Sequence, residues 1–124
     1  MKVYKLVTVR NGLLTSWFVT GEAQVVYAID GEIQLVEMSL AFDTLKHAKI
    51  YLGYGNIHSE IWEAECESAK SVGKIIDCIY DVTLMRIQEW LNGRLLSHQS
   101  MYAPTGTVLC KNLRLTKRVS DDMG

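Results

Sequence analysis

Cross-links, chain breakers and long apolar runs are all scarce in this sequence. Its 124 residues include one proline and three cysteines, and Cys66, Cys78 and Cys110 form no C-x-x-C pair. An odd number of widely spaced cysteines indicates reduced, buried thiols and not a disulfide framework. No apolar run reaches the roughly 18 residues that a membrane helix needs, and the alternating N-terminus lacks a signal-peptide core. We therefore expect a cytoplasmic protein without membrane contact.

Excess charge of either sign is also missing. The formal net charge is -1, so no overall field draws the chain to nucleic acid, and sequence-specific nucleic-acid binding is not expected. An apolar content of 48% over this length is typical of one globular domain, here residues 1–124. Because a small core leaves much surface uncovered, we also expect a homo-oligomer.

Several signatures of catalysis and cofactor binding are absent. No G-x-G-x-x-G motif opens a helix, and no Gly-Lys-Ser/Thr follows a glycine-rich loop, which argues against Rossmann and P-loop sites. His47, His58 and His98 have no ligand partner at the short spacing from which metal sites are built. The prediction is a chain with no metal, no cofactor and no catalytic residues.

Turn signals are the clearest features that are present. Asn11-Gly12 separates KVYKLVTV from LLTSWFV, and Asp30-Gly31 separates QVVYAI from EIQLVE. Both dipeptides favour the positive φ angles of two-residue hairpin loops, so they predict two antiparallel hairpins. In the first strand Val3, Lys5 and Val7 share one face and Tyr4 and Leu6 the other, which favours a central strand covered on both faces.

Helical spacing occurs in two places. Residues 45–52 follow an Asp43-Thr44 N-cap and end before Gly53 and Gly55. A second helix is predicted over 82–92, capped by Asp81, while 74–80 fits either a strand or a helix. Strands are predicted for SEIWEAEC and for Thr107 to Val119. Together these elements predict an α+β fold, a mostly antiparallel sheet built from hairpins with two short helices on one face or end.

Two glutamates on the predicted strand IWEAEC form an E-x-E pair, Glu63 and Glu65. The pair, with the preceding LAFDTLKHAKIYL, resembles the arrangement by which ADP-ribosyltransferases hold a ribose hydroxyl. The resemblance implies Arg10 as the early arginine, but a Ser-Thr-Ser strand is missing and only Thr15-Ser16 is present. Alternating glutamates are also the ordinary solvent face of a strand, and the transferase is a minor alternative.

The stretch APTGTVLCKNLRLTKR supplies the candidate binding residues. Four of the thirteen Lys and Arg lie between 111 and 118, and strand alternation predicts Arg114, Thr116 and Arg118 on one face, with the two arginines about 13 Å apart. Such a pair suits a ligand with several phosphates, or a site shared by two subunits. Thr105 and Thr107 add hydroxyls in the preceding turn. The competing interpretation is that outward Lys and Arg only protect an edge strand from pairing.

Four segments of the chain together resemble small bacteriophage proteins. They are the first hairpin KVYKLVTVRNGLLTS, the helix LAFDTLKHAKIYL, the strand EIWEAE and the C-terminal segment APTGTVLCKNLRLTKRV. The chain is similar to the Thoeris anti-defence sponges in its size and in the late arginine pair separated by four residues. The resemblance implies a protein that binds and sequesters a cyclic nucleotide or cyclic ADP-ribose immune signal in the host cytoplasm without cleaving it. It implies phosphate contacts from Arg114 and Arg118 and stacking of Tyr102 on adenine.

A different class of function explains the same lack of catalytic motifs. The chain would then be a protein–protein inhibitor of a host defence complex, acting through an exposed sheet edge or the helix around Trp90. Ligand dependence separates the two hypotheses, because only the sequestering protein requires Arg114.

Overall fold

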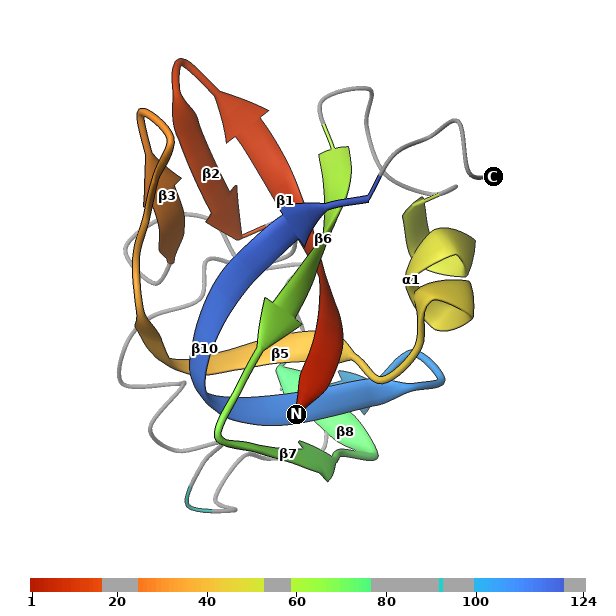
Figure 1. The fold of residues 1–124 in the computed structure, drawn as a ribbon. Coiled ribbons are helices and arrows are strands. Elements are labelled where there is room, and N and C mark those ends of the chain that lie inside the picture. Colours follow the sequence, from red (N-terminus) through yellow and green to blue (C-terminus); the bar gives the residue numbers. More distant parts are fainter. Residues whose placement is uncertain (17–24, 53–58, 77–91, 93–99, 120–124) are drawn as a thin grey trace.

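The computed structural model describes residues 1–16, 25–52, 59–76, 92 and 100–119. This part of the chain is mostly β-structure with a single helix (Figure 1). The elements in chain order are β1 Lys2–Arg10, β2 Leu13–Ser16, β3 Val26–Ile29, β4 Glu32–Ile33, β5 Val36–Phe42, α1 Leu45–Leu52, β6 Ser59–Glu65, β7 Ser68–Ser71, β8 Lys74–Ile76, β9 Ser100–Tyr102 and β10 Thr107–Arg118.

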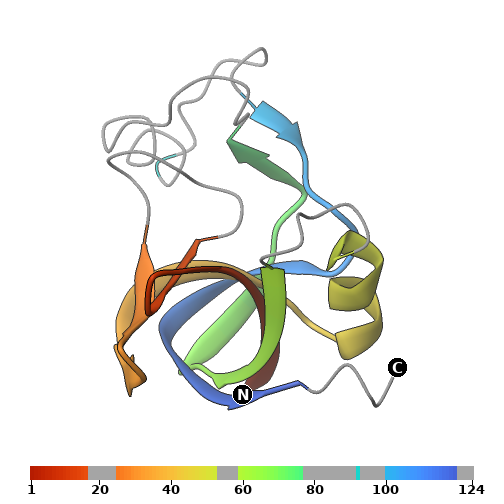
Figure 2. The ribbon, with the colours of Figure 1, turned by 90° about the horizontal axis from the view of Figure 1, so that it is seen from above.

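Four strands close a small barrel. β1 pairs with β6, β6 with β10, β10 with β5, and β5 returns to β1, all antiparallel. β2, β3 and β4 extend the sheet outward from β1, and β7 continues the pairing of β10. β8 and β9 form a separate two-stranded ribbon that projects away from the barrel (Figure 2).

The predicted hairpin turns are confirmed. Asn11 and Gly12 have φ angles of 47° and 82°, and Asp30 and Gly31 have 49° and 84°, so both loops use the left-handed region that these residue types tolerate. They join β1 to β2 and β3 to β4. Local turn chemistry thus sets the register of the two hairpins.

Two apolar clusters lie on opposite faces of the barrel wall. The inner cluster fills the barrel with side chains from β1, β5, β6 and β10, including the fully buried Val7, Cys110 and Leu113. The outer cluster lies between the wall and α1 and contains Leu6 and Ile61. β1 is therefore covered on both faces and paired on both edges, as its sequence predicts.

The helix over 45–52 is confirmed. Thr44 caps it, because its hydroxyl accepts a hydrogen bond from the amide of His47 at 3.2 Å. Ala48 is buried against the barrel, and the ring of Tyr51 lies 5.7 Å from that of Phe42. The glycines expected to end the helix, Gly53 and Gly55, lie outside the described residues.

The predicted α+β class is wrong. The structure is a β-barrel with one helix in its described part, because long-range pairings close the sheet and no local sequence pattern signals them. The second predicted helix, 82–92, and residues 77–80 lie outside the described residues, while 74–76 form a strand. In β6, strand alternation predicts that the face with Ile61, Glu63 and Glu65 is exposed to solvent, but part of this face is buried because Ile61 packs with α1.

Candidate functional site

The barrel is least complete at the seam between β1 and β5. These strands pair only at Tyr4 and Phe42, and from Val7 onward the same edge of β1 pairs with β2. Where the backbone pairing stops, the ammonium group of Lys5 donates a hydrogen bond to the carbonyl oxygen of Leu40 at 2.5 Å. A side chain therefore joins the two strands where a sheet ladder would otherwise continue.

A pocket of about 50 Å³ opens at this seam. The side facing β1 and β5 is formed by Lys5, Leu6, Leu40, Ala41 and Phe42, and the rest of the lining consists of Tyr51, Ile75, Pro104 and Thr107. The described lining is thus almost wholly apolar and contains one charged side chain. A concave apolar site with few polar groups is the usual form of a small-molecule site.

Lys5 is itself buried, with 8% of its surface exposed. Its ammonium nitrogen lies 5.1 Å from the centre of the Tyr27 ring, a cation–π distance, and the Tyr27 hydroxyl is held by Ser39 at 2.6 Å. Among the described residues no carboxylate forms an ion pair with Lys5. The pocket is therefore lined by a positively charged residue that has no negatively charged partner among the described residues.

The turn at Pro104–Thr107 borders the pocket and is fixed by hydrogen bonds. The Thr107 hydroxyl donates to the Pro104 carbonyl at 2.6 Å, and the Asp43 amide donates to the Gly106 carbonyl at 2.9 Å. Asp43 and the Nδ1 atom of His47 lie 2.6 Å apart beside the turn. Gly106 has φ +88°, and a Cβ there would lie 2.2 Å from that Nδ1 atom, so glycine is required.

The predicted site residues divide between two places. Tyr102, Thr105 and Thr107 lie at or near this turn, and Tyr102 is 80% exposed. Of these three, only Thr107 lines the pocket, with its hydroxyl bonded within the turn. Arg114 is seven residues further along β10, about 23 Å of extended strand, so the structure does not bring the two groups together.

The predicted common face of the arginines is wrong. The register of β10 against β6 shifts between Leu115 and Lys117, so Thr116 is an extra, bulged residue. Arg114 lies opposite Glu65 and Arg118 opposite Trp62, which are three residues apart in β6 and thus on opposite faces.

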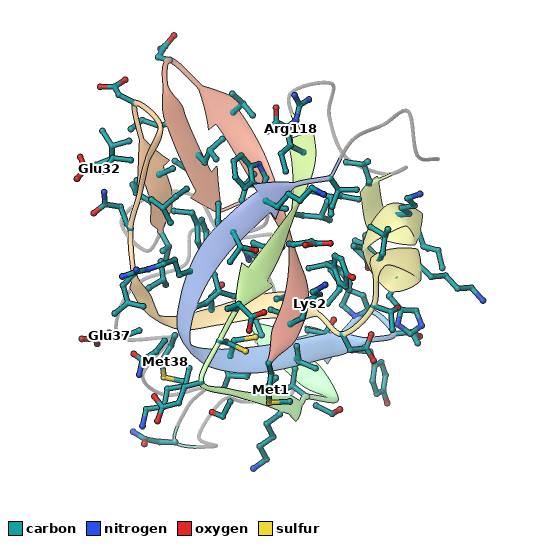
Figure 3. The ribbon with its side chains drawn as sticks, in the orientation of Figure 1. Met1, Lys2, Glu32, Glu37, Met38 and Arg118 are labelled. Carbon is teal, nitrogen blue, oxygen red and sulfur yellow. The ribbon has the colours of Figure 1, made fainter. Side chains whose placement is uncertain are left out.

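Two exposed side chains near this bulge, Thr116 and Arg118, have partners within the barrel. The Thr116 hydroxyl donates to the Glu63 carbonyl at 3.1 Å. Arg118, near the far end of the barrel from Met1 (Figure 3), pairs with Glu60 at 3.3 Å, and the indole of Trp62 donates to the same carboxylate at 3.0 Å. These contacts fit the interpretation in which the charges belong to the sheet surface.

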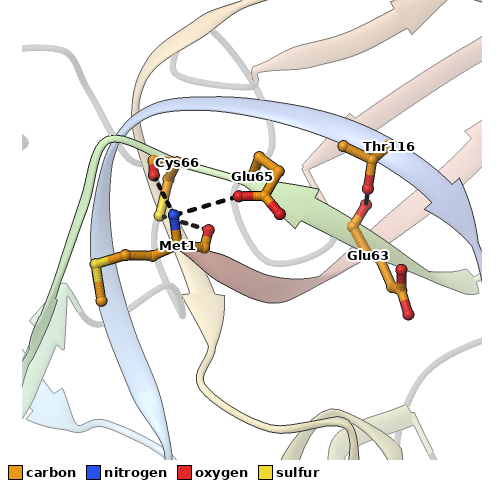
Figure 4. A network of polar contacts seen from close by, with 5 residues as sticks. All are labelled: Met1, Glu63, Glu65, Cys66 and Thr116. Carbon is orange, nitrogen blue, oxygen red and sulfur yellow. Dashed lines mark hydrogen bonds and ion pairs between the residues drawn. The ribbon is translucent and has the colours of Figure 1, made fainter.

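The E-x-E pair contacts the N-terminus of the same chain. The Met1 ammonium lies 3.2 Å from Glu65 and donates to the Cys66 carbonyl at 2.8 Å (Figure 4). Glu63 faces Lys2 at 3.9 Å. Both carboxylates thus have cationic partners that hold the start of β1 against β6. The Arg10 side chain lies outside the described residues.

Two buried cysteines lie inside the barrel. Cys66 and Cys110 are free thiols, and Cys78 lies outside the described residues. Burial, followed by the neighbouring Cys66 thiol, raises the pKa of Cys110 to about 12. Cys110 is therefore a neutral thiol at pH 7, as expected for an inert core cysteine. Where the structure describes the chain, no cluster of three metal-ligating side chains occurs; His58 and His98 lie outside it.

Sequence reasoning missed Lys5 as the centre of the site. The signal was present, because strand alternation places Lys5 on the same face as Val3 and Val7, both of which the structure buries. A lysine between two core positions is unusual, since lysine is seldom fully buried without a partner.

The chain matches no known protein family, no curated protein and no solved structure at a significant level. No helix in the described part of the chain is long and apolar enough to cross a membrane.

Proposed function

We propose that the protein captures a small molecule of nucleotide type and does not convert it. The binding site in this proposal is the pocket at the β1–β5 seam. The observation that carries it is that, among the lining residues that the structure describes, one buried charged side chain, Lys5, lies in a concave wall that is otherwise almost wholly apolar. Capture needs affinity alone, so it places no demand for a nucleophile or a general base on the pocket.

The size of the pocket limits what enters it. About 50 Å³ accommodates one group of a nucleotide and not the whole molecule, so the remainder lies outside the pocket. Tyr102 is strongly exposed and only two residues before Pro104, which lines the pocket, so at most about 7 Å of chain separates them. Stacking on an exposed tyrosine ring is a general way to hold a base.

The biological setting of the proposal rests on the sequence resemblance. In that setting the chain is a bacteriophage anti-defence protein that acts as a homo-oligomer in the host cytoplasm. Its ligand is a cyclic nucleotide or a cyclic ADP-ribose derivative that serves as an immune signal. Arg114 and Arg118 occupy different faces of β10, so this proposal does not use them as a pair within one chain.

Thermal unfolding of the purified protein with a panel of ligands tests the proposal. The panel contains ADP-ribose derivatives, cyclic di- and trinucleotides and NAD, and each ligand is recovered afterwards and identified by mass spectrometry. A ligand at 100 times its Kd stabilises the folded state by about 2.7 kcal/mol. A raised midpoint with the ligand intact supports capture. Conversion of a ligand, or no shift with any, contradicts it.

A protein-binding function is the second candidate, and exposed apolar side chains favour it. Leu35 is 55% exposed and Met38 42%, and Figure 3 shows Met38 at the outside of the barrel near Glu37. Exposed residues of this size are typical of protein interfaces when they form a patch. In that case Leu35→Asp and Met38→Asp abolish activity in a host-defence assay, whereas Lys5→Met has no effect.

A further inference from the structure

The charge of Lys5 is the feature of this barrel that core packing alone does not explain. The side chain lies on the inner face of β1 between Val3 and Val7, which are 2% and 0% exposed. A buried ammonium is costly to desolvate unless an opposite charge compensates it. Among the described residues none does, so the free protein holds a charge that a hydrophobic side chain of the same length would avoid.

The described groups that face this ammonium are neutral. Leu40 supplies a carbonyl oxygen and Tyr27 the face of its ring. The Cys110 thiol is close enough for the positive charge to act on it, yet burial keeps its pKa near 12 and the sulfur stays protonated at pH 7. An ammonium has three N–H donors, of which the Leu40 carbonyl uses one.

The wall around Lys5 determines what else a ligand must bring. Leu6, Ala41 and Phe42 present apolar surface, and no second cationic side chain occurs in the described lining. One ammonium balances one negative charge, while a doubly charged phosphate monoester would leave one charge buried in apolar surroundings. The group that fits is therefore small, singly charged and attached to an apolar or weakly polar body.

We propose that the pocket at the β1–β5 seam is an oxyanion site in which Lys5 binds a singly charged carboxylate or phosphodiester. This inference rests on the proposed function and narrows it to cyclic nucleotides, because each of their phosphodiesters carries one negative charge, whereas the pyrophosphate of a cyclic ADP-ribose derivative carries two. The ligand replaces the missing counter-charge, and a hydrogen bond between ionised partners is about twice as strong as a neutral one.

The test compares anions with neutral molecules of nearly the same shape. The probes are benzoate against benzamide, and dimethyl phosphate against trimethyl phosphate, each titrated into the ¹⁵N-labelled full-length protein and followed by NMR. Lys5→Met is the test variant. Lys2→Met is the matched control, since Lys2 is in the same strand, is exposed and pairs with Glu63.

We expect at least one anion to bind the wild type and Lys2→Met no less than tenfold more tightly than its neutral analogue, with shifts at Leu6, Phe42 and Thr107. In Lys5→Met the ratio falls to about one. Preference for benzoate identifies a carboxylate site, and preference for dimethyl phosphate a phosphodiester site. Equal binding of anion and neutral molecule by the wild type, an unchanged ratio in Lys5→Met, or no binding overturns the proposal.

Two further measurements keep the proposal separable from folding and from the proposed function. The ammonium signal of ¹⁵N-labelled Lys5 in the wild type should shift with the preferred anion and not with its neutral analogue, which requires no variant. A nucleotide that stabilises wild type and Lys5→Met equally leaves the proposed function intact and contradicts the oxyanion site.

Discussion

The ammonium group of Lys5 bonds to the carbonyl oxygen of Leu40 and joins β1 to β5 at the place where their backbone pairing ends. If this contact served only to hold the two strands together, a neutral side chain could do so without the desolvation cost of a buried ammonium group. The Leu40 carbonyl also accepts a hydrogen bond from the Ser39 hydroxyl at 3.2 Å, so it does not depend on the lysine. The contact thus fixes the ammonium at the seam, beside the pocket that Lys5 helps to line.

Replacing Lys5 by methionine is therefore expected to leave stability unchanged or to raise it by about 1–4 kcal/mol, because the desolvation cost of a buried charge disappears. Urea unfolding of Lys5→Met beside the exposed control Lys2→Met measures this, with the control within about 0.5 kcal/mol of the wild type. If the unfolding free energy of Lys5→Met falls by more than about 2 kcal/mol, the lysine stabilises the fold.

Gly106→Ala is expected to destabilise the protein more than Gly31→Ala. Both glycines have φ near +85°, so both alanines carry backbone strain of about 1–3 kcal/mol. At Gly106 the new Cβ also meets His47 and Asp43, whereas at Gly31 it has open space. Thermal and urea unfolding give the difference, expected to exceed 1 kcal/mol. Equal losses would mean that the turn beside the pocket is not held as described.

Arg118→Ala is expected to change ligand affinity less than twofold. Its partner is Glu60, its side chain is 56% exposed, and an exposed ion pair contributes less than about 1 kcal/mol to stability. Arg114→Ala serves as the comparison on the other face of the strand. If either variant loses more than tenfold in affinity for a ligand that stabilises the wild type, the ligand binds along β10 and not at the seam.

Alkaline solution should weaken the fold through Cys110. Because its folded pKa of about 12 exceeds the ordinary value of 9.0, the folded state retains the proton that the unfolded state loses. Stability from this group is complete below pH 9 and falls as pH rises toward 12, at up to about 1.4 kcal/mol per pH unit. Cys110→Ala should show a lower unfolding free energy at pH 8 but a shallower decline above pH 9. An identical decline in both proteins would contradict the assignment.

Alkylation of the cysteines tests independently whether their thiols are buried. Cys66 and Cys110 should resist alkylation at pH 8 in the native protein, with labelling rates that follow unfolding, because the reactive species is the thiolate. Peptide mass spectrometry after iodoacetamide treatment reads each site. Fast modification of either residue under native conditions would contradict the packing of the barrel interior.

The parts of the fold that depend on neighbours in sequence were predictable. Asn11-Gly12 and Asp30-Gly31 indicate their turns because few other residue pairs tolerate positive φ, and Thr44 marks the start of the helix because its hydroxyl caps the first turn. Barrel closure was not predictable, since the pairing of β1 with β6 brings together Lys2 and Glu65, whose contact leaves no local pattern.

In the candidate site, too, local features could be predicted from the sequence and features that depend on distant residues could not. The turn at Pro104–Thr107 was identified from its residue types, but the alternation of Leu113, Leu115 and Lys117 gives no sign of the bulge at Thr116 that separates the arginines. Alternation placed Lys5 on the same face of its strand as Val3 and Val7. Only the path of β5 past it shows that this position also lines a pocket.

The central claim is that ligand binds at the β1–β5 seam, and mapping of backbone amide shifts on titration tests it most directly. The ligand is whichever member of the nucleotide panel, or failing that whichever anion probe, stabilises the protein. The account predicts saturable shifts centred on Leu6, Ala41, Phe42 and Thr107, with a lower affinity in Lys5→Met than in the wild type. Shifts centred on Arg114 and Arg118, or no shifts at saturating concentration, would contradict it.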